Sequence, residues 1–161
     1  MSHEIETMAY AGETPWHGLG NPVSNNMTPE EMLVAADLNW TVSKRQAYTL
    51  DNPNCLNLLD PRSEANFLRC DGNYFLTRDS DNKILSPCGE GYVPFQNHQV
   101  LDFFKKFTEA GNMQMETAGS LKAGKDIWGL AKLNQKYELA GNDEVGGYLL
   151  VNNSHTVGKA R

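Results

Sequence analysis

The stretch that decides the fold begins at Met113 and reads MQMETAGSLKAGKDIWGLAKL. It predicts two strands, 113–118 and 126–133, joined by a turn over 120–125 in which Gly124 is free to adopt a positive φ. A strongly apolar helix is expected before this hairpin, and another apolar strand after it. A hairpin flanked in this way predicts an α+β fold.

Two main helices are predicted to pack on an antiparallel, twisted sheet built of hairpins and a meander. The first begins at Thr28 as N-cap residue, and Glu31 completes its capping box. The second begins at Asn97, which suits the N-cap position, and ends before Gly111. Its apolar residues follow the spacing of one helix face and are predicted to lie in the core: Val100, Phe103, Phe104 and Phe107.

Further strands are predicted on both sides of the second helix. Residues 40–50 alternate apolar and polar side chains, which is typical of a half-buried strand. Residues 148–151 are wholly apolar and predict a strand in the interior of the sheet. Good turn sequences separate three short strands that are expected to form a meander: 67–70, 74–77 and 83–85.

Two segments lack a convincing period. Residues 1–26 are rich in Gly, Pro and Asn and predict an N-terminal loop segment, whereas residues 51–65 predict an irregular excursion. A chain of 161 residues suits a single domain. Residues 156–161 show no pattern that would end the fold, so we expect an incomplete or processed form of a longer domain.

Composition and charge narrow the class of protein. An apolar share of 40% and a charged share of 21% are typical of a globular protein rather than a disordered chain. The net charge of −6 disfavours a surface that binds phosphates everywhere. Residues 1–100 hold six Lys and Arg against thirteen Asp and Glu, whereas residues 101–161 hold eight against seven. An anion-binding face is therefore expected in the C-terminal part.

Cysteine usage and hydropathy point to the inside of a cell. No apolar run approaches the ~18 residues needed to span a bilayer, and the N-terminus lacks the basic and apolar regions of a signal peptide. We therefore expect a soluble, cytoplasmic protein without membrane association. The cysteines form no C-x-x-C pair, which indicates reduced thiols: Cys55, Cys70 and Cys88.

The segment PWHGLG, residues 15–20, places an indole beside an imidazole on a glycine-rich loop. In one interpretation Trp16 fills the edge of the core and His17 hydrogen-bonds to the backbone. In another, Trp16 is a stacking platform and His17 a polar contact for a ligand. Metal ligation by His17 is the third interpretation, although no second ligand stands at a helical or C-x-x-C spacing from it.

Further candidate binding residues lie in the C-terminal part. Lys122 and Lys125 on the central hairpin suit contacts with phosphates, and Trp128 suits base stacking. Polar residues follow the apolar run 148–151 directly. Polar groups at the end of a buried strand are a common site, but Asn-Asn-Ser is also a turn sequence. Both interpretations stand for the remaining candidates, Asn153, Ser154 and His155.

Six segments carry a family resemblance: residues 6–10, 12–20, 92–97, 116–121, Asp143 and 153–155. In this order they resemble the phage and plasmid-like family known as domain of unknown function 932. The resemblance implies a protein of phages, prophages or plasmids that works in a bacterial cytoplasm, with no agreed reaction. The family also resembles phage annealing and recombination proteins in gene context and in rough α+β architecture. This resemblance implies that the protein binds nucleic acid.

The sequence departs from the family pattern near its end. Members continue after Ser-His with Asp-Gly-Ser and another strand, whereas His155 is followed here by Thr156 and Val157. The resemblance therefore implies an abbreviated, processed or fragmentary member. Without the further strand, residues 148–151 would present an unpaired edge, which favours a homo-oligomer or a second chain as partner.

Two binding functions follow from these patterns. The first is a non-catalytic accessory protein that binds single-stranded nucleic acid in recombination or replication. It would use Lys122, Lys125 and Lys132 for phosphates, with Trp128 or Trp16 for stacking. The alternative is a protein-binding factor that acts on host machinery, in takeover or anti-defence, or in phage assembly. An acidic surface suits this alternative equally well.

A metal-assisted enzyme is the third and least favoured function. It would require convergence of His17, His98, His155 and Asp143, yet no spacing shows a nucleophile with its base or a set of metal ligands. The glycines of residues 88–97 also lack the spacing of a phosphate-binding loop. We therefore expect no cofactor, no metal and no catalytic residue.

Overall fold

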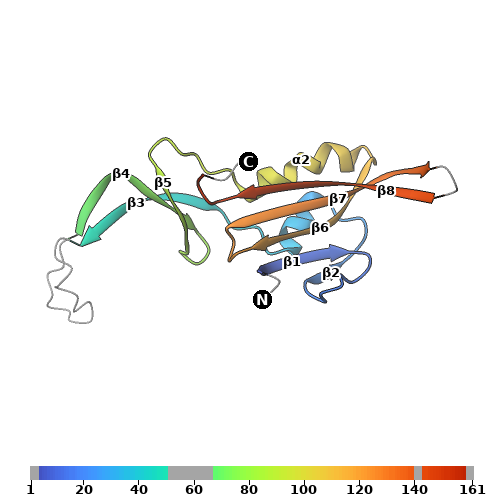
Figure 1. Ribbon diagram of the computed structural model, residues 1–161, viewed down its shortest axis with the longest axis horizontal. Coiled ribbons are helices and arrows are strands. Elements are labelled where there is room, and N and C mark those ends of the chain that lie inside the picture. The colour runs from blue at the N-terminus through green and yellow to red at the C-terminus, as the bar shows by residue number, and fades with distance from the viewer. Residues whose placement is uncertain (1–3, 51–66, 140–142, 159–161) are drawn as a thin grey trace.

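A computed structural model describes residues 4–50, 67–139 and 143–158, without the side chains of 136–139 and 143–144. The predicted excursion at 51–65 lies outside these residues. The described chain forms a five-stranded sheet in the order β2-β1-β6-β7-β8, a three-stranded sheet in the order β3-β4-β5, and two helices (Figure 1). The predicted α+β fold is thereby confirmed. The elements are β1 (Ile5–Ala11), β2 (Asn21–Val23), α1 (Pro29–Ala35), β3 (Val42–Leu50), β4 (Phe67–Arg78), β5 (Ile84–Gly89), α2 (Asn97–Glu109), β6 (Met113–Leu121), β7 (Asp126–Leu139) and β8 (Asp143–Ser154).

The central hairpin forms as predicted, from β6 and β7. Gly124 has a φ of +83° in the turn, and Lys122 and Ala123 before it also have positive φ. β7 pairs in antiparallel fashion with β6 on one side and with β8 on the other, while β1 pairs with β6. β7 extends beyond the predicted end at 133, as far as Leu139.

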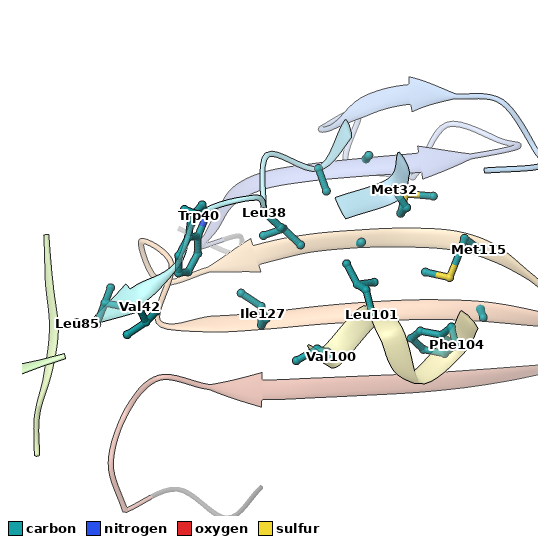
Figure 2. Packing of buried hydrophobic residues seen from close by; sticks show 14 of the residues in the cluster. Met32, Leu38, Trp40, Val42, Leu85, Val100, Leu101, Phe104, Met115 and Ile127 are labelled. Carbon is teal, nitrogen blue, oxygen red and sulfur yellow. The ribbon is translucent and has the colours of Figure 1, made fainter. Parts of the chain in front are cut away.

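Both helices cover the same face of the five-stranded sheet. Lys105 of α2 and Glu30 of α1 form an ion pair of 2.6 Å between Nζ and Oε1, which joins the two helices side by side. Figure 2 shows Leu101 and Phe104 of α2 packed over the strands. This close approach requires Gly129 in β7, because an added Cβ there would lie 2.8 Å from Cδ2 of Leu101.

One hydrophobic core continues from the five-stranded sheet into the three-stranded one. Trp40 lies where the two sheets meet, with the Arg78 guanidinium 5.3 Å from its ring centroid. Arg78 of β4 also donates two hydrogen bonds of 3.0 Å to the Glu6 carboxylate of β1. Figure 2 labels the larger core residues: Met32, Leu38, Trp40, Val42, Leu85, Val100, Leu101, Phe104, Met115 and Ile127.

The prediction of a loop over residues 1–26 is wrong for two of its parts. Residues 5–11 form β1, between β2 and β6, and residues 21–23 form the short parallel strand β2. β1 shows no polar alternation because the sheet interior buries consecutive residues, Met8 to Ala11, from both faces.

The two short strands predicted at 67–70 and 74–77 are one strand, β4. The intervening Asp-Gly-Asn sequence is a bulge rather than a turn, and Gly72 accommodates it with a φ of +72°. Gln46 of β3 stabilises the bulge, because its side-chain amide donates to the carbonyls of Cys70 and Asn73.

Two details of α2 differ from the prediction. Its N-cap is Gln96, and Asn97 is a buried first helical residue whose amide donates to the carbonyls of Leu38 and Trp40. Phe104 is fully buried, but Phe103 and Phe107 are 48% and 38% exposed. The prediction of a core position is therefore wrong for these two, because the buried stripe of α2 follows positions 97, 100, 101 and 104 instead.

The apolar run 148–151 also lies elsewhere than predicted. It belongs to β8, which stands at the edge of the five-stranded sheet rather than in its interior. Leu149 and Val151 face the core, whereas Tyr148 and Leu150 are 52% and 59% exposed.

Candidate functional site

The face of the five-stranded sheet opposite the helices carries the candidate site. Side chains of a strand alternate between the two faces. In β7, Ile127, Gly129 and Ala131 face the helices, so Trp128 and Leu130 project from the other face together with Lys132. We call this second surface the helix-free face.

β8 extends the helix-free face with matching side chains. Its register places Asn152 opposite Trp128, Leu150 opposite Leu130, and Tyr148 opposite Lys132. The Lys132 ammonium lies 5.9 Å from the ring centroid of Tyr148, which is a cation–π contact. Over β1 the same face is closed off, because Met8 and Tyr10 are both 7% exposed, with Gly20 of the β1–β2 loop against them.

The indole of Trp128 lies flat over β6. An added Cβ at Gly119 would lie 2.4 Å from Cη2 of Trp128, so only glycine leaves room for the ring there. The indole Nε1 donates a hydrogen bond of 3.3 Å to Oγ1 of Thr117, which fixes the orientation of the ring. Trp128 is only partly buried and thus presents a rigid aromatic surface on this face.

A cavity of about 400 Å³ lies beside this indole. We call it the Trp128 pocket, and its lining combines apolar side chains with a carboxylate, amides and a hydroxyl. Lys122 stands at its rim, with Nζ 3.1 Å from Oδ2 of Asp126. The lining residues are Leu121, Asp126, Ile127, Trp128, Leu150, Asn152, Asn153 and Ser154.

A second cavity, of about 240 Å³, lies between the two helices and the start of β6. Its charged residues include Glu30 and Lys105, which pair with each other. Hydrogen bonding to Lys105 lowers the pKa of Glu30, and the same bond raises the pKa of Lys105. The Trp128 pocket is the better candidate, because it is the larger of these two cavities and is lined by an aromatic ring as well as polar groups.

The sequence comparison assigns most of this region to a family. Residues 84–157 match the family model described as Domain of unknown function (DUF932). This segment belongs to the DUF932 family. It runs from β5 to just beyond β8 and contains every residue of the Trp128 pocket. No curated protein and no solved structure matches the chain.

The DUF932 segment contains two of the predicted motifs in direct contact. Asn153 donates from Nδ2 to the carbonyl of Phe95 at 3.3 Å, and Nε2 of His155 lies 2.9 Å from Oδ1 of Asn97. His155 is fully buried, 5.5 Å from the ring of Trp40, and its amide donates to the carbonyl of Lys125. These side chains therefore tie the end of β8 to the start of α2.

The remaining predicted residues lie in three places. Trp128 and Ser154 line the Trp128 pocket. Lys122, which pairs with Asp126, and Lys125 lie in the β6–β7 turn, whereas Trp16 and His17 belong to the β1–β2 loop. Trp16 is 84% exposed, so the interpretation that it fills the core edge is wrong. Nδ1 of His17 accepts a hydrogen bond of 3.0 Å from the Leu19 amide, as the backbone-contact interpretation predicts.

Two polar residues of the pocket were not among the predicted site residues. Asp126 stands in no motif, and Asn152 begins the Asn-Asn-Ser segment of which only the later residues were candidates. Asn152 could have been found from the apolar run at 148–151, which predicts a strand. Because side chains alternate along a strand, Asn152 lies on the same face as Leu150, and the pairing of β8 with β7 places it opposite Trp128.

The described residues offer no metal centre. Among them, no group of three or more His, Cys, Asp and Glu side chains could hold a metal ion. His98 is exposed on α2, His155 is enclosed by the core, and the side chain of Asp143 lies outside the description. Burial raises the pKa of the Cys88 thiol, which disfavours the reactive thiolate. No helix in the described part of the chain has the length and hydrophobicity to cross a bilayer.

Proposed function

We propose that the protein binds single-stranded nucleic acid on its helix-free face, with one base in the Trp128 pocket. The observation that carries this proposal is the indole held flat on β6 by Gly119 and Thr117, beside a cavity lined with polar groups. Base stacking on aromatic rings is tolerant of sequence, because every base has a π-face. Binding of this kind requires no catalytic group.

The polar groups of the pocket suit the edge of a base. The Asp126 carboxylate accepts hydrogen bonds from amino and imino groups, and the Asn152 amide both donates and accepts. Lys122 lies beside Asp126 and supplies a positive charge for the neighbouring phosphate.

A second contact point extends the surface along the strands. Lys132 and Tyr148 lie four residues along β7 from Trp128, a distance of about 13 Å at the usual rise of a strand. Two aromatic rings, each with a lysine nearby, thus project from one face. Because these lysines lie on one face, they can bind phosphates although the net charge of the chain is −6. Binding of this kind should depend strongly on the salt concentration.

The decisive experiment is a titration of a fluorescent single-stranded oligonucleotide at low and high salt. Replacing Trp128 by Ala should weaken binding about 5- to 150-fold, which corresponds to the 1–3 kcal/mol of one stacked base. The Lys122→Glu/Lys125→Glu double variant removes two proposed phosphate contacts and should make the slope of log affinity against log salt less steep by about 1.4.

Two matched variants serve as controls. Trp16→Ala removes an indole on the β1–β2 loop, and Lys106→Glu reverses an exposed charge on the helix side. Both should bind like the unaltered protein. Absence of binding at low salt, or a loss for Trp16→Ala with none for Trp128→Ala, would contradict the proposal.

A protein-binding factor is the second candidate function. It is favoured by the apolar side chains of the helix-free face, since Leu130 is partly exposed and Leu150 is 59% exposed. A host or phage protein captured by the unaltered chain, lost with Leu130→Glu and retained with Lys122→Glu, would support this function over nucleic-acid binding.

The biological setting forms part of the proposal. We infer a phage- or plasmid-encoded accessory protein that acts in the bacterial cytoplasm, in recombination or replication. The DUF932 match and the helix-free face with its aromatic residues and lysines support this setting. Self-association stays a prediction and would use another surface, the outer edge of β8.

A further inference from the structure

β8 is a long edge strand whose outer side offers hydrogen bonds. It covers 12 residues, and β7 is its one neighbour in the strand order of the described chain. The amide of His155 donates to the carbonyl of Lys125 on the β7 side. Because amides alternate in direction along an antiparallel strand, those of Tyr148, Leu150 and Asn152 point away from β7.

Most of this edge lacks two common protections against pairing, charged side chains and proline. Residues 145–154 contain neither. On the helix-free side, Tyr148 and Leu150 are 52% and 59% exposed. On the helix side, Leu149 and Val151 are only partly buried. The edge is thus apolar on both faces.

α2 adds two exposed phenylalanines beside the same edge. The ion pair of Lys105 with Glu30 places α1 along one flank of α2. On a helix of 3.6 residues per turn, positions 103 and 107 lie on the opposite flank from position 105, which is the flank towards β8. Phe103 and Phe107 are 48% and 38% exposed, and their ring centroids are 5.7 Å apart.

We propose that a second copy of this chain pairs with β8, so that two sheets join into one continuous antiparallel sheet. Leu150 of the two copies would meet at the two-fold axis, and the Phe103–Phe107 pairs would pack against each other in the helix layer. With Leu150 at the axis, residues 146–154 of the two copies face each other over about 30 Å. With two layers, roughly 20 Å, of thickness this gives about 600 Å² per partner, which is at the lower end of the ~1,200–2,000 Å² in total of a specific interface.

The charges of β8 favour a second copy in this orientation. Its acidic residues, at 143 and 144, are confined to its first end, and the residues that would face them in the other copy, 157 and 156, are uncharged, as are 152–154. A two-fold axis makes the strands antiparallel, so the acidic end of each copy lies opposite the uncharged end of the other. Parallel pairing would instead place like charges side by side.

The first test is the mass of the full chain in solution, by light scattering after size exclusion. We expect a dimer of twice 17.9 kDa. Leu150→Lys and Phe103→Glu change exposed side chains and should each give a monomer with an unchanged circular dichroism spectrum. Val34→Glu is the matched control, because Val34 is 61% exposed on α1 and should leave the dimer intact.

The second test is a disulfide across the proposed axis. In a background with Cys55 and Cys70 changed to serine, Leu150→Cys should form a covalent dimer on mild oxidation, whereas Val34→Cys should remain a monomer. A monomer at all concentrations would overturn the proposal. So would a dimer that survives both Leu150→Lys and Phe103→Glu, or one that Leu150→Cys fails to cross-link. None of these outcomes depends on nucleic-acid binding.

Discussion

At the scale of single residues, three glycines make the central hairpin possible. Gly119 leaves the space that the Trp128 indole occupies, and Gly129 leaves the space for Leu101 and Phe104 of α2. Gly124 combines a φ of +83° with close approach, since an added Cβ would lie 2.8 Å from Nη1 of Arg78. The hairpin is therefore specified as much by absent side chains as by apolar ones.

Replacing Gly129 by Ala should destabilise the fold. The added methyl group would displace Leu101 and Phe104 from the sheet, and overpacking of this kind costs about 1–3 kcal/mol. Urea denaturation measures the change. Gly91→Ala is the control, because an added Cβ there meets nothing within 4 Å, and it should change the free energy of unfolding by less than about 0.5 kcal/mol. Equal stability of the two variants would contradict this role of Gly129.

At the scale of elements, the features that depend on neighbouring residues could be predicted from the sequence, whereas those that depend on strand pairing could not. The start of α1 could be predicted because Thr28 and Glu31 form their capping box within four residues of sequence. The β6–β7 turn was predictable for the same reason. β1 was missed because only its position between two other strands explains its apolar residues. The Trp128 pocket was predicted only in part, because the pairing of β7 with β8 brings Asn152 to Trp128.

The β4–β5 turn gives the fold a defined dependence on acid. Hydrogen bonds from Thr41 lower the pKa of Asp79, and those from Arg78 lower the pKa of Asp81 to about 2. A carboxylate whose pKa is lower in the folded state stabilises the protein above its unfolded pKa of 3.8. This contribution is lost as the pH falls through the folded value.

The free energy of unfolding should therefore decrease as the pH falls from about 5 to about 2, near the folded pKa of Asp81. The Asp79→Asn/Asp81→Asn variant should be less stable than the unaltered protein by a constant amount above about pH 5, and the difference should shrink towards about pH 2. Urea denaturation at a series of pH values provides the measurement. A difference that stays the same throughout would show that these carboxylates are not the source.

At the scale of the whole molecule, one arginine joins the two sheets. Arg78 of β4 binds Glu6 of β1, packs on Trp40 and contacts Asp81, and its side chain is only 11% exposed. Figure 1 shows the three-stranded sheet extending from one end of the five-stranded one, and Arg78 adds charged contacts to the apolar core that the two sheets share. The relative position of the sheets should depend on this residue.

Arg78→Met should destabilise the protein by about 2–3 kcal/mol, because it removes two charged hydrogen bonds to Glu6 and leaves this carboxylate with the Lys83 ammonium, 3.8 Å away, as its cationic partner. Urea denaturation gives the value. Arg69→Met removes an ion pair whose side chains are 61% and 87% exposed, and should cost less than about 1 kcal/mol. Comparable losses in both variants would mean that Arg78 is no more than a surface charge.

The strand order has a consequence for biosynthesis. β1 emerges from the ribosome before its main partner β6, which lies more than a hundred positions later in the chain. Until those later residues have been translated, the apolar segment Met8 to Ala11 lacks the strand that buries it. Closure of the sheet is thus delayed until β6 has been synthesised, and until then the nascent chain exposes an apolar segment of the kind that is prone to aggregation.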